Sequence, residues 1–62
     1  MRLQNPTSKT IYALLGNEHG AQGKDIFVPP GSSITVTLTS GQAMNFKELE
    51  PKLRDLGLVI TP

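Results

Sequence analysis

The clearest pattern along the chain is a strict alternation of apolar and polar residues from Ser32 to Thr39. Ile34, Val36 and Leu38 share one face of an extended backbone, and the positions between them hold threonine. Side chains alternate between the two faces of a strand, and β-branched residues favour strands. The segment therefore predicts a β-strand with one face in a core and the other in water.

Residues 10–15 and 25–28 carry two further runs of β-forming residues. The first run is apolar nearly throughout and too short for a typical helix, which predicts a strand buried on both faces. The second predicts a short strand. After it, Pro30 presets φ for the first central position of a turn, and Gly31 tolerates the positive φ of the second. This pairing predicts a type II turn before the alternating strand.

A helical pattern follows the alternating strand. Its apolar residues recur at helical spacing and form one stripe, which consists of Phe46, Leu49, Leu53 and Leu56. Asn45 and Glu48 resemble a capping box. Pro51 conflicts with one continuous helix, because proline lacks a backbone donor and clashes with the carbonyl four residues earlier. The sequence therefore predicts a turn around residues 45–50 and then a short helix that begins at Pro51.

The end of this helix has the sequence of a glycine C-cap. Gly57 fits the left-handed position after a helix, where Leu58 can contact Leu53 as in a Schellman motif. Residues 58–60 then predict a last strand that returns to the sheet.

The expected fold class is mainly β: a small barrel or roll of four to five short strands, with one short helix before the last strand. Residues 1–8 are expected to form an N-terminal extended arm or an edge strand, because Pro6 restricts Asn5 to extended conformations. Residues 9–62 are expected to form a single small β domain. The expected core collects the apolar positions of these elements: Ile11, Ala13, Leu15, Ile26, Val28, Ile34, Val36, Leu38, Leu53, Leu56, Leu58 and Ile60.

A chain of 62 residues without cysteine has few means to stabilise its fold. Domains of about 60 residues bury only about 60% of their unfolded surface, and natural ones add disulfides, metals or oligomerisation. Disulfides and thiolate metal sites are excluded here, so assembly with other subunits is the remaining route. No apolar run is long enough to span a membrane, and the N-terminus lacks the apolar stretch of a signal peptide. A cytoplasmic origin is therefore expected.

The charge is close to balanced, with six lysines and arginines against five acidic residues and a net charge of +1. The basic residues are spread along the chain, whereas nucleic-acid binders usually concentrate them in a stripe. Tyr12 and Phe27 lie in apolar segments and are expected in the core, not on a platform for stacking bases. Nucleic-acid binding is therefore disfavoured, but small barrels do serve that role, and this class stays open as the alternative.

No constellation of residues indicates catalysis or a cofactor. No serine stands in the Gly-x-Ser-x-Gly context of a nucleophile elbow, and Lys24 is followed by aspartate where a phosphate-binding loop requires serine or threonine. Glu18, His19 and Asp25 are close in sequence but lack a fourth metal donor. We therefore expect a protein that is not an enzyme and binds no cofactor or metal within one chain. A site shared between subunits stays open.

The threonine-rich face of residues 32–39 has two interpretations. It can be an ordinary solvated face, or it can belong to an adhesive strand that pairs across subunits through backbone hydrogen bonds. Lysine and glutamate are absent from residues 29–45, so few charges oppose such pairing. The adhesive interpretation is favoured.

Three features of the sequence, taken together, resemble those of a known class of proteins. They are an asparagine-containing opening before a strand (residues 5–11), a Pro-Pro-Gly turn leading into an alternating strand (residues 29–36), and a closing Leu-x-x-Leu-Gly-Leu-Val-Ile (residues 53–60). In these the chain resembles short virion proteins of tailed bacteriophages, which are small β proteins that decorate capsids or lie at the head–tail junction. The resemblance implies many copies per particle, contacts with a coat or tail protein, and no catalysis.

The expected function is therefore that of a non-enzymatic structural component of a viral particle, in capsid decoration or at the head–tail junction or tail. The expected partners are coat or tail protein subunits and copies of the chain itself, with no membrane. The expected location is the virion, after synthesis in the host cytoplasm; the alternative is a small β-barrel that binds nucleic acid. The residues expected to contact partners come from the arm and from an exposed loop: Arg2, Leu3, Gln4, Asn5, Asn17, Glu18 and His19.

Overall fold

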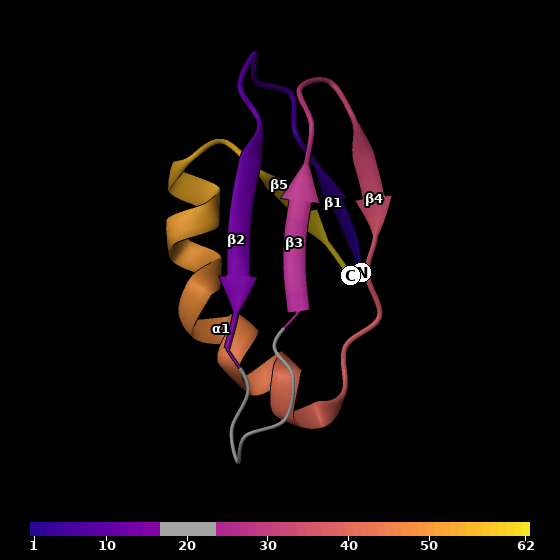
Figure 1. Ribbon diagram of the computed structural model, residues 1–62, viewed down its shortest axis with the longest axis vertical. Helices are drawn as coiled ribbons and strands as arrows, with labels where there is room; N and C mark the ends of the chain where they lie inside the picture. The colour runs from indigo at the N-terminus through magenta and orange to yellow at the C-terminus, as the bar shows by residue number, and fades with distance from the viewer. Residues whose placement is uncertain (17–23) are drawn as a thin grey trace.

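The computed structural model describes residues 1–16 and 24–62, which form two small antiparallel sheets and one helix (Figure 1). The elements follow the order β1 (Arg2–Gln4), β2 (Ile11–Leu15), β3 (Lys24–Val28), β4 (Ser33–Thr35), α1 (Ser40–Asp55) and β5 (Val59–Thr61). β1 is the middle strand of a three-stranded sheet with the order β4-β1-β5, and β2 pairs with β3. The β2–β3 sheet lies in front of the three-stranded sheet in Figure 1, and α1 runs alongside β2.

The prediction of a mainly β chain with a helix before the last strand agrees with this order of elements. The predicted barrel is wrong, because the described strands form two separate sheets that do not close on each other. The strands are only three to five residues long, and a sheet of two or three such strands is too narrow to curl into a closed barrel. The helix is also longer than predicted, at 16 residues.

α1 continues through Pro51 without a break, so the predicted turn at residues 45–50 and the helix start at Pro51 are wrong. Proline removes the hydrogen bond that would reach the carbonyl of Lys47. Lys47 and Pro51 are both exposed, so water can satisfy that carbonyl. Burial of Phe46 and Leu53 on the inner side of the same helix favours one continuous element across the proline.

The helix begins earlier than predicted, and its N-cap is Thr39. The Thr39 hydroxyl accepts a hydrogen bond from the backbone N–H of Gln42 at 3.3 Å, and the Gln42 side chain accepts one from the Thr39 N–H at 3.1 Å. This is a complete capping box, and the predicted one at Asn45 and Glu48 is wrong. Both segments have a capping residue followed three positions later by Glu or Gln, and the N-cap at Thr39 lies six residues earlier, more than one helical turn.

The two glycine-dependent turns are confirmed. At the end of α1, Gly57 has φ of 104°, its N–H donates to the Arg54 carbonyl at 3.0 Å, and the Leu58 N–H donates to the Leu53 carbonyl at 3.1 Å. These are the two bonds of a Schellman motif. After β3, Gly31 has φ of 71°, and the Ser32 N–H donates to the Pro29 carbonyl at 3.2 Å, as in a type II turn.

The alternating segment is a strand over only part of its predicted length. β4 ends at Thr35, and Val36 extends the pairing by exchanging two hydrogen bonds with Met1, at 2.8 and 2.9 Å. The chain then leaves the sheet and reaches the N-cap of α1. The alternation nevertheless describes burial correctly, because Val36 is buried and Ile34 and Leu38 are partly buried against the core.

The start of the chain is not the arm or edge strand expected from the sequence. β1 pairs with β4 on one side and with β5 on the other, so that Leu3 lies opposite both Ile34 and Ile60. The Leu3 side chain is fully buried. A segment with only one apolar residue among polar neighbours gives little local signal, and its central position comes from pairing with strands distant in sequence.

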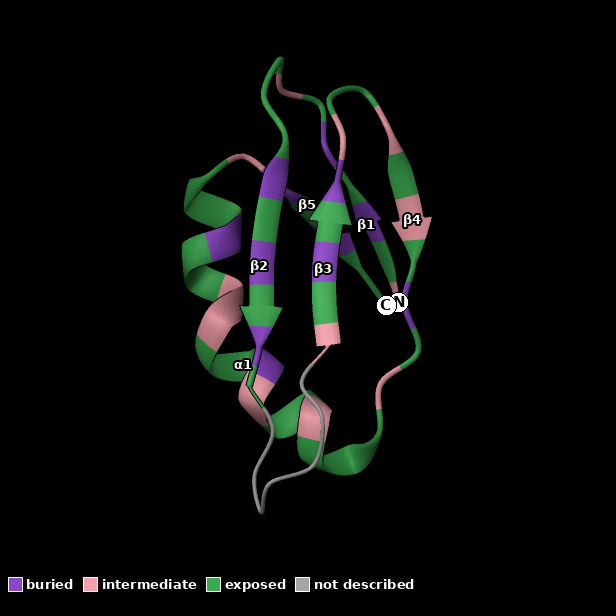
Figure 2. Cartoon of the chain, viewed as in Figure 1, coloured by how far each residue is buried: buried purple, intermediate pink, exposed green. Residues whose placement is uncertain are grey.

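The core lies between the two sheets and α1, and Figure 2 shows the buried residues alternating with exposed ones along β2 and β3. Most of the predicted core is confirmed. Leu56 is 51% exposed, so its prediction as a core residue is wrong. Leu3 and Phe46 were not among the predicted core residues, and both are buried. The buried apolar residues are Leu3, Ile11, Ala13, Leu15, Ile26, Val28, Val36, Phe46, Leu53, Leu58 and Ile60.

Asn5 is the one polar residue among the described buried residues. Its Nδ2 donates to the carbonyl of Lys9 at 2.7 Å and to the carbonyl of Val28 at 2.9 Å. Its Oδ1 accepts from the N–H of Thr7 at 3.0 Å and from the Thr7 hydroxyl at 2.6 Å. The amide therefore joins the end of β1 to the approach to β2 and to the end of β3, and all of its polar atoms are satisfied.

Asn5→Asp is expected to lower the free energy of unfolding by about 3 kcal/mol or more at neutral pH, because it removes two donors and buries a carboxylate against two carbonyls. The loss should shrink at low pH, where a protonated carboxyl can again donate one bond. Gln4→Glu makes the same chemical change at an exposed neighbour and should alter stability by less than about 0.5 kcal/mol. Equal denaturation midpoints for the two variants would show that Asn5 does not join the sheets.

Candidate interaction surface

The outer face of the β2–β3 sheet carries three large exposed apolar side chains. Tyr12 is 56% exposed, Leu14 62% and Phe27 55%. The register places Tyr12 directly opposite Phe27, so the two aromatic side chains form a cross-strand pair. We call Tyr12, Leu14 and Phe27 the apolar patch.

The patch follows from the pairing of the two strands. Ile11, Ala13 and Leu15 of β2 are buried, and so are Ile26 and Val28 of β3. The residues between them must therefore point to the opposite face. The prediction that residues 10–15 are buried on both faces is wrong, and so is the expectation that Tyr12 and Phe27 belong to the core.

A cluster of exposed apolar side chains indicates an interaction site, whereas a single exposed side chain does not. Scattered exposed apolar residues are ordinary in folded proteins, whereas a contiguous patch on a soluble protein usually marks an interaction site. Tyrosine is also among the residues that most often dominate binding energy at protein interfaces. The patch is therefore the strongest candidate for a functional surface in the part of the chain that the structure describes.

One acidic side chain lies on the same outer face. Asp25 pairs with Leu14 across the sheet, and its Oδ1 accepts a hydrogen bond from the Tyr12 hydroxyl at 3.2 Å. This hydrogen bond and the negative charge of the carboxylate both raise the pKa of Tyr12 above its ordinary value of 10.0. The patch thus combines apolar surface with one carboxylate.

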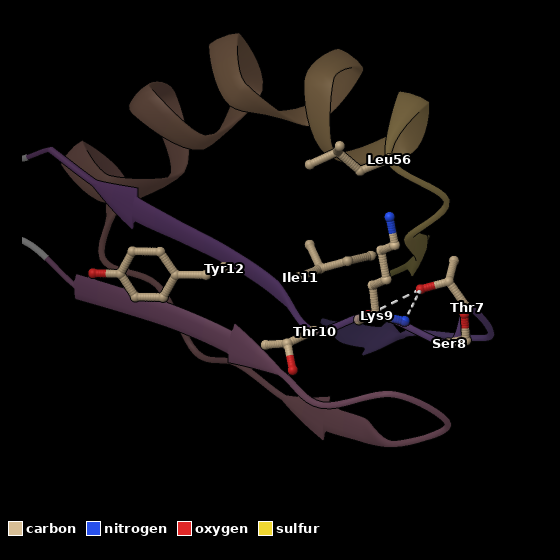
Figure 3. A pocket seen from close by; sticks show the side chains of 7 residues that line it. All are labelled: Thr7, Ser8, Lys9, Thr10, Ile11, Tyr12 and Leu56. Carbon is tan, nitrogen blue, oxygen red and sulfur yellow. Dashed lines mark hydrogen bonds between the residues drawn. The ribbon is translucent and has the colours of Figure 1, made fainter.

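A groove lies beside the patch, between the approach to β2 and the end of α1 (Figure 3). Its volume is about 400 Å³, and it is lined by Thr7, Ser8, Lys9, Thr10, Ile11, Tyr12 and Leu56. Tyr12 belongs to both the groove and the patch. Near the groove the chain is tightly packed, because a Cβ added to Gly57 would lie 2.6 Å from the Thr7 methyl. Gly57 is therefore required both for its positive φ and for this contact.

The structure does not bring the predicted contact residues together. Arg2 and Gln4 are exposed on β1, and Arg2 donates a hydrogen bond to the Ser33 hydroxyl at 3.4 Å. Leu3 and Asn5 are fully buried, so their side chains are not accessible to a partner in this fold, which corrects the prediction for these two. The other predicted contact residues lie outside the described residues: Asn17, Glu18 and His19.

One feature of the sequence, the charge of Asp25, indicates part of the outer face that carries the patch. Asp25 is charged and stands at the start of a short apolar run, so its side chain should face solvent. Period-two alternation then places Phe27 on the same outer face. In β2 no polar residue marks the outer face, and the register with β3 is needed to assign it.

The remaining classes of site find no support in the described residues. Over residues 1–16 and 24–62, no group of three or more histidine, cysteine, aspartate and glutamate side chains could hold a metal ion. No helix in the same ranges is long and apolar enough to cross a membrane.

No protein-family model matches the chain, and no curated protein or solved structure matches it.

Asp25→Asn is expected to lower the pKa of Tyr12 toward its ordinary value, because the variant removes the negative charge that opposes formation of the phenolate. The chain has one tyrosine and no tryptophan, so the ultraviolet absorbance of tyrosinate reports this group alone. Asp55→Asn removes an exposed carboxylate from α1 and should leave the titration unchanged. Identical titrations for the Asp25 variant and the unmodified chain would mean that the two side chains do not interact in solution.

Proposed function

We propose that the chain is a non-enzymatic component of a larger assembly and that it binds other protein subunits through the apolar patch. The observation that carries this proposal is the clustering of Tyr12, Leu14 and Phe27 on one face, each more than half exposed. Leaving these side chains in water forgoes the free energy that their burial would release. A partner that covers the patch recovers it.

The size of the patch favours an assembly with many contacts. Full burial of a large apolar side chain contributes about 1.5 to 3 kcal/mol, so the exposed halves of three side chains contribute roughly 3 kcal/mol together. Association costs about 4 to 15 kcal/mol in lost translational and rotational freedom. One patch alone therefore gives weak binding, whereas many linked copies gain affinity through multivalency.

The assembly that we propose is a viral particle. The support is the resemblance of the chain to small virion proteins of tailed bacteriophages, together with a small fold that has an exposed apolar face. In this proposal the partners are coat or tail protein subunits and further copies of the chain. Arg2 and Gln4 are exposed on β1 of the three-stranded sheet, so any contact that they make with a partner would be separate from the apolar patch.

Replacing patch residues is expected to prevent assembly without unfolding the chain. Leu14→Ser combined with Phe27→Ser should lower incorporation into purified particles by about tenfold or more, because it removes much of the burial energy of the contact. Met44→Ser is the matched control, since Met44 is 65% exposed but lies on α1. Quantitative mass spectrometry of the particles measures incorporation, and circular dichroism verifies folding.

Full incorporation of the double variant would contradict the role of the patch. Absence of the unmodified chain from purified particles would contradict the virion assignment and leave only the general proposal of a protein-binding surface. Equal loss for the double variant and for Met44→Ser would mean that incorporation depends on overall surface hydrophobicity and not on this face.

The alternative function, nucleic-acid binding, is favoured by one feature of the same surface. Exposed aromatic side chains such as Tyr12 and Phe27 can stack on bases. Against this, Asp25 lies on the same face and is hydrogen-bonded to Tyr12, so a phosphate backbone would meet a carboxylate. Proteins that bind single-stranded nucleic acids have their aromatic side chains in a positively charged groove instead.

Fluorescence anisotropy with labelled single-stranded DNA and RNA distinguishes the two functions. The protein-binding proposal predicts no affinity for either polymer at low salt. Affinity that falls steeply as the salt concentration rises, and that is lost in Phe27→Ser, would favour nucleic-acid binding.

A further inference from the structure

The three-stranded sheet has a free edge on β4. This strand pairs only with β1 among the described strands, and it lies at the right margin of the molecule in Figure 1. Ser32 and Val36 are hydrogen-bonded to residues at the two ends of β1. Backbone groups alternate in direction along an antiparallel strand, so the N–H and C=O groups of Ser33 and Thr35 point away from β1.

Nothing in the described structure opposes pairing at this edge. The backbone groups of Ser33 and Thr35 have no partner among the described residues, and both side chains are exposed. Edge strands of natural sheets usually carry charges or proline, which oppose pairing with another chain. Residues 31–45 contain no charged residue and no proline, so β4 offers a template for a further strand.

The other outer strands are occupied at their edges. On β5, Arg54 donates a hydrogen bond to the Ile60 carbonyl at 3.2 Å. On β3, the Asn5 side chain donates to the Val28 carbonyl at 2.9 Å, and α1 runs alongside β2. Pairing of β4 with any of these edges would meet groups that are already bonded or covered, whereas pairing of β4 with another β4 joins free groups on both sides.

We propose that β4 pairs with β4 of a second copy of the chain, antiparallel and across a two-fold axis. The two sheets then become one continuous sheet with three strands from each copy. A contact between identical edges is isologous and closes at two copies. The inference goes beyond the proposed function, since it gives the chain a second contact on a surface separate from the apolar patch.

The register of this pairing follows from which groups are free. The next carbonyl on the same side of the chain, that of Thr37, accepts a hydrogen bond from the Lys24 ammonium at 3.1 Å, which confines the pairing to Ser33 and Thr35. A two-fold axis at Ile34 places Ser33 of each copy opposite Thr35 of the other, and each such pair exchanges both hydrogen bonds. Ile34 then lies opposite Ile34 of the second copy, and its partly buried side chain is covered further.

The charge of the sheet permits this contact. Arg2 is the one charged residue of the three strands, and it lies opposite Thr35 on β1. Neighbouring strands are about 4.8 Å apart, so the β1 strands that carry the two arginines are separated by about 14 Å across the pair of β4 strands. This separation exceeds the Debye length of about 8 Å at physiological ionic strength, so repulsion between the two copies is screened.

The first test follows the unmodified, nitrogen-15-labelled chain as its concentration rises to the millimolar range. Exchange of the Ser33 and Thr35 amide hydrogens should slow by about twofold when half of the chains are paired, because only the unpaired half exchanges. The Ile34 amide, which points toward β1, should change less. In a mixture of isotope-labelled and unlabelled chains, a contact between the Hα atoms of Ile34 in the two copies should appear, since residues of this kind of pair lie closest.

The second test places charges on the edge. One variant combines Ser33→Lys with Thr35→Lys, and the other combines Ser33→Glu with Thr35→Glu. Like charges directly opposite each other are destabilising, so each variant alone should self-associate roughly threefold or more weakly than the unmodified chain. An equimolar mixture of the two variants should recover at least the unmodified affinity, because every cross-strand pair then joins a lysine to a glutamate.

Val59→Lys combined with Thr61→Lys is the matched control for the lysine variant. Both residues are exposed on β5, at the opposite edge of the same sheet, and the control has the same net charge as the lysine variant. It should therefore self-associate more strongly than the lysine variant. Circular dichroism verifies folding, and the exchange measurements on the unmodified chain decide the proposal if a variant does not fold.

A chain that stays monomeric at millimolar concentration would overturn the proposal, and so would exchange at Ser33 and Thr35 that does not depend on concentration. Equal weakening in the β5 control, or no recovery in the mixture, would also overturn it. These outcomes are separable from failure of the proposed function, which is tested by incorporation into particles. Self-association that is lost in the Leu14 and Phe27 double variant but kept in both edge variants would assign the contact to the patch instead.

Discussion

The buried side chain of Asn5 links the end of β1 to the end of β3 and so ties the two sheets together. The amide bonds locally to the Lys9 carbonyl and to the backbone and hydroxyl of Thr7, and across the fold to the Val28 carbonyl, 23 residues away in sequence. The backbone of Asn5 adds two more bonds, to Ser32 and Gly31. A buried polar group must find partners or destabilise the fold, and here these partners fix how the two sheets lie against each other.

This constraint decides which faces are buried. With β1 joined to the ends of β2 and β3, the side of the β2–β3 sheet that carries Ile11 and Val28 turns inward and packs with Leu3 and α1. The side that carries Tyr12 and Phe27 turns outward. The apolar patch is therefore a consequence of the same packing that forms the core, and none of the helices and strands in residues 1–16 and 24–62 covers it.

Local chemistry in the sequence predicted local structure well. The turn at Gly31 and the helix end at Gly57 were predicted because each needs a residue that tolerates positive φ, and both are present. The residues of β2 and β3 that were named for the core are all buried: Ile11, Ala13, Leu15, Ile26 and Val28.

The wrong predictions concern features that depend on contacts between residues distant in sequence. Pro51 is unfavourable within a helix, yet burial of Phe46 and Leu53 on either side of it favours one continuous helix. β1 became central because two distant strands, β4 and β5, pair with it. The outer face of β2 could not be told from the inner one, since both are apolar. Part of the candidate site was therefore invisible until the register with β3 was known.

Tyr12 and Phe27 are more than half exposed in the isolated chain, and we propose that other subunits cover them in the assembly. Hydroxyl-radical labelling followed by mass spectrometry measures both states directly, and the buried Phe46 is an internal reference. We expect strong labelling of Tyr12 and Phe27 in the isolated chain, protection of both on assembly, and weak labelling of Phe46 throughout. Weak labelling of the pair in the isolated chain, or unchanged labelling after assembly, would contradict this proposal.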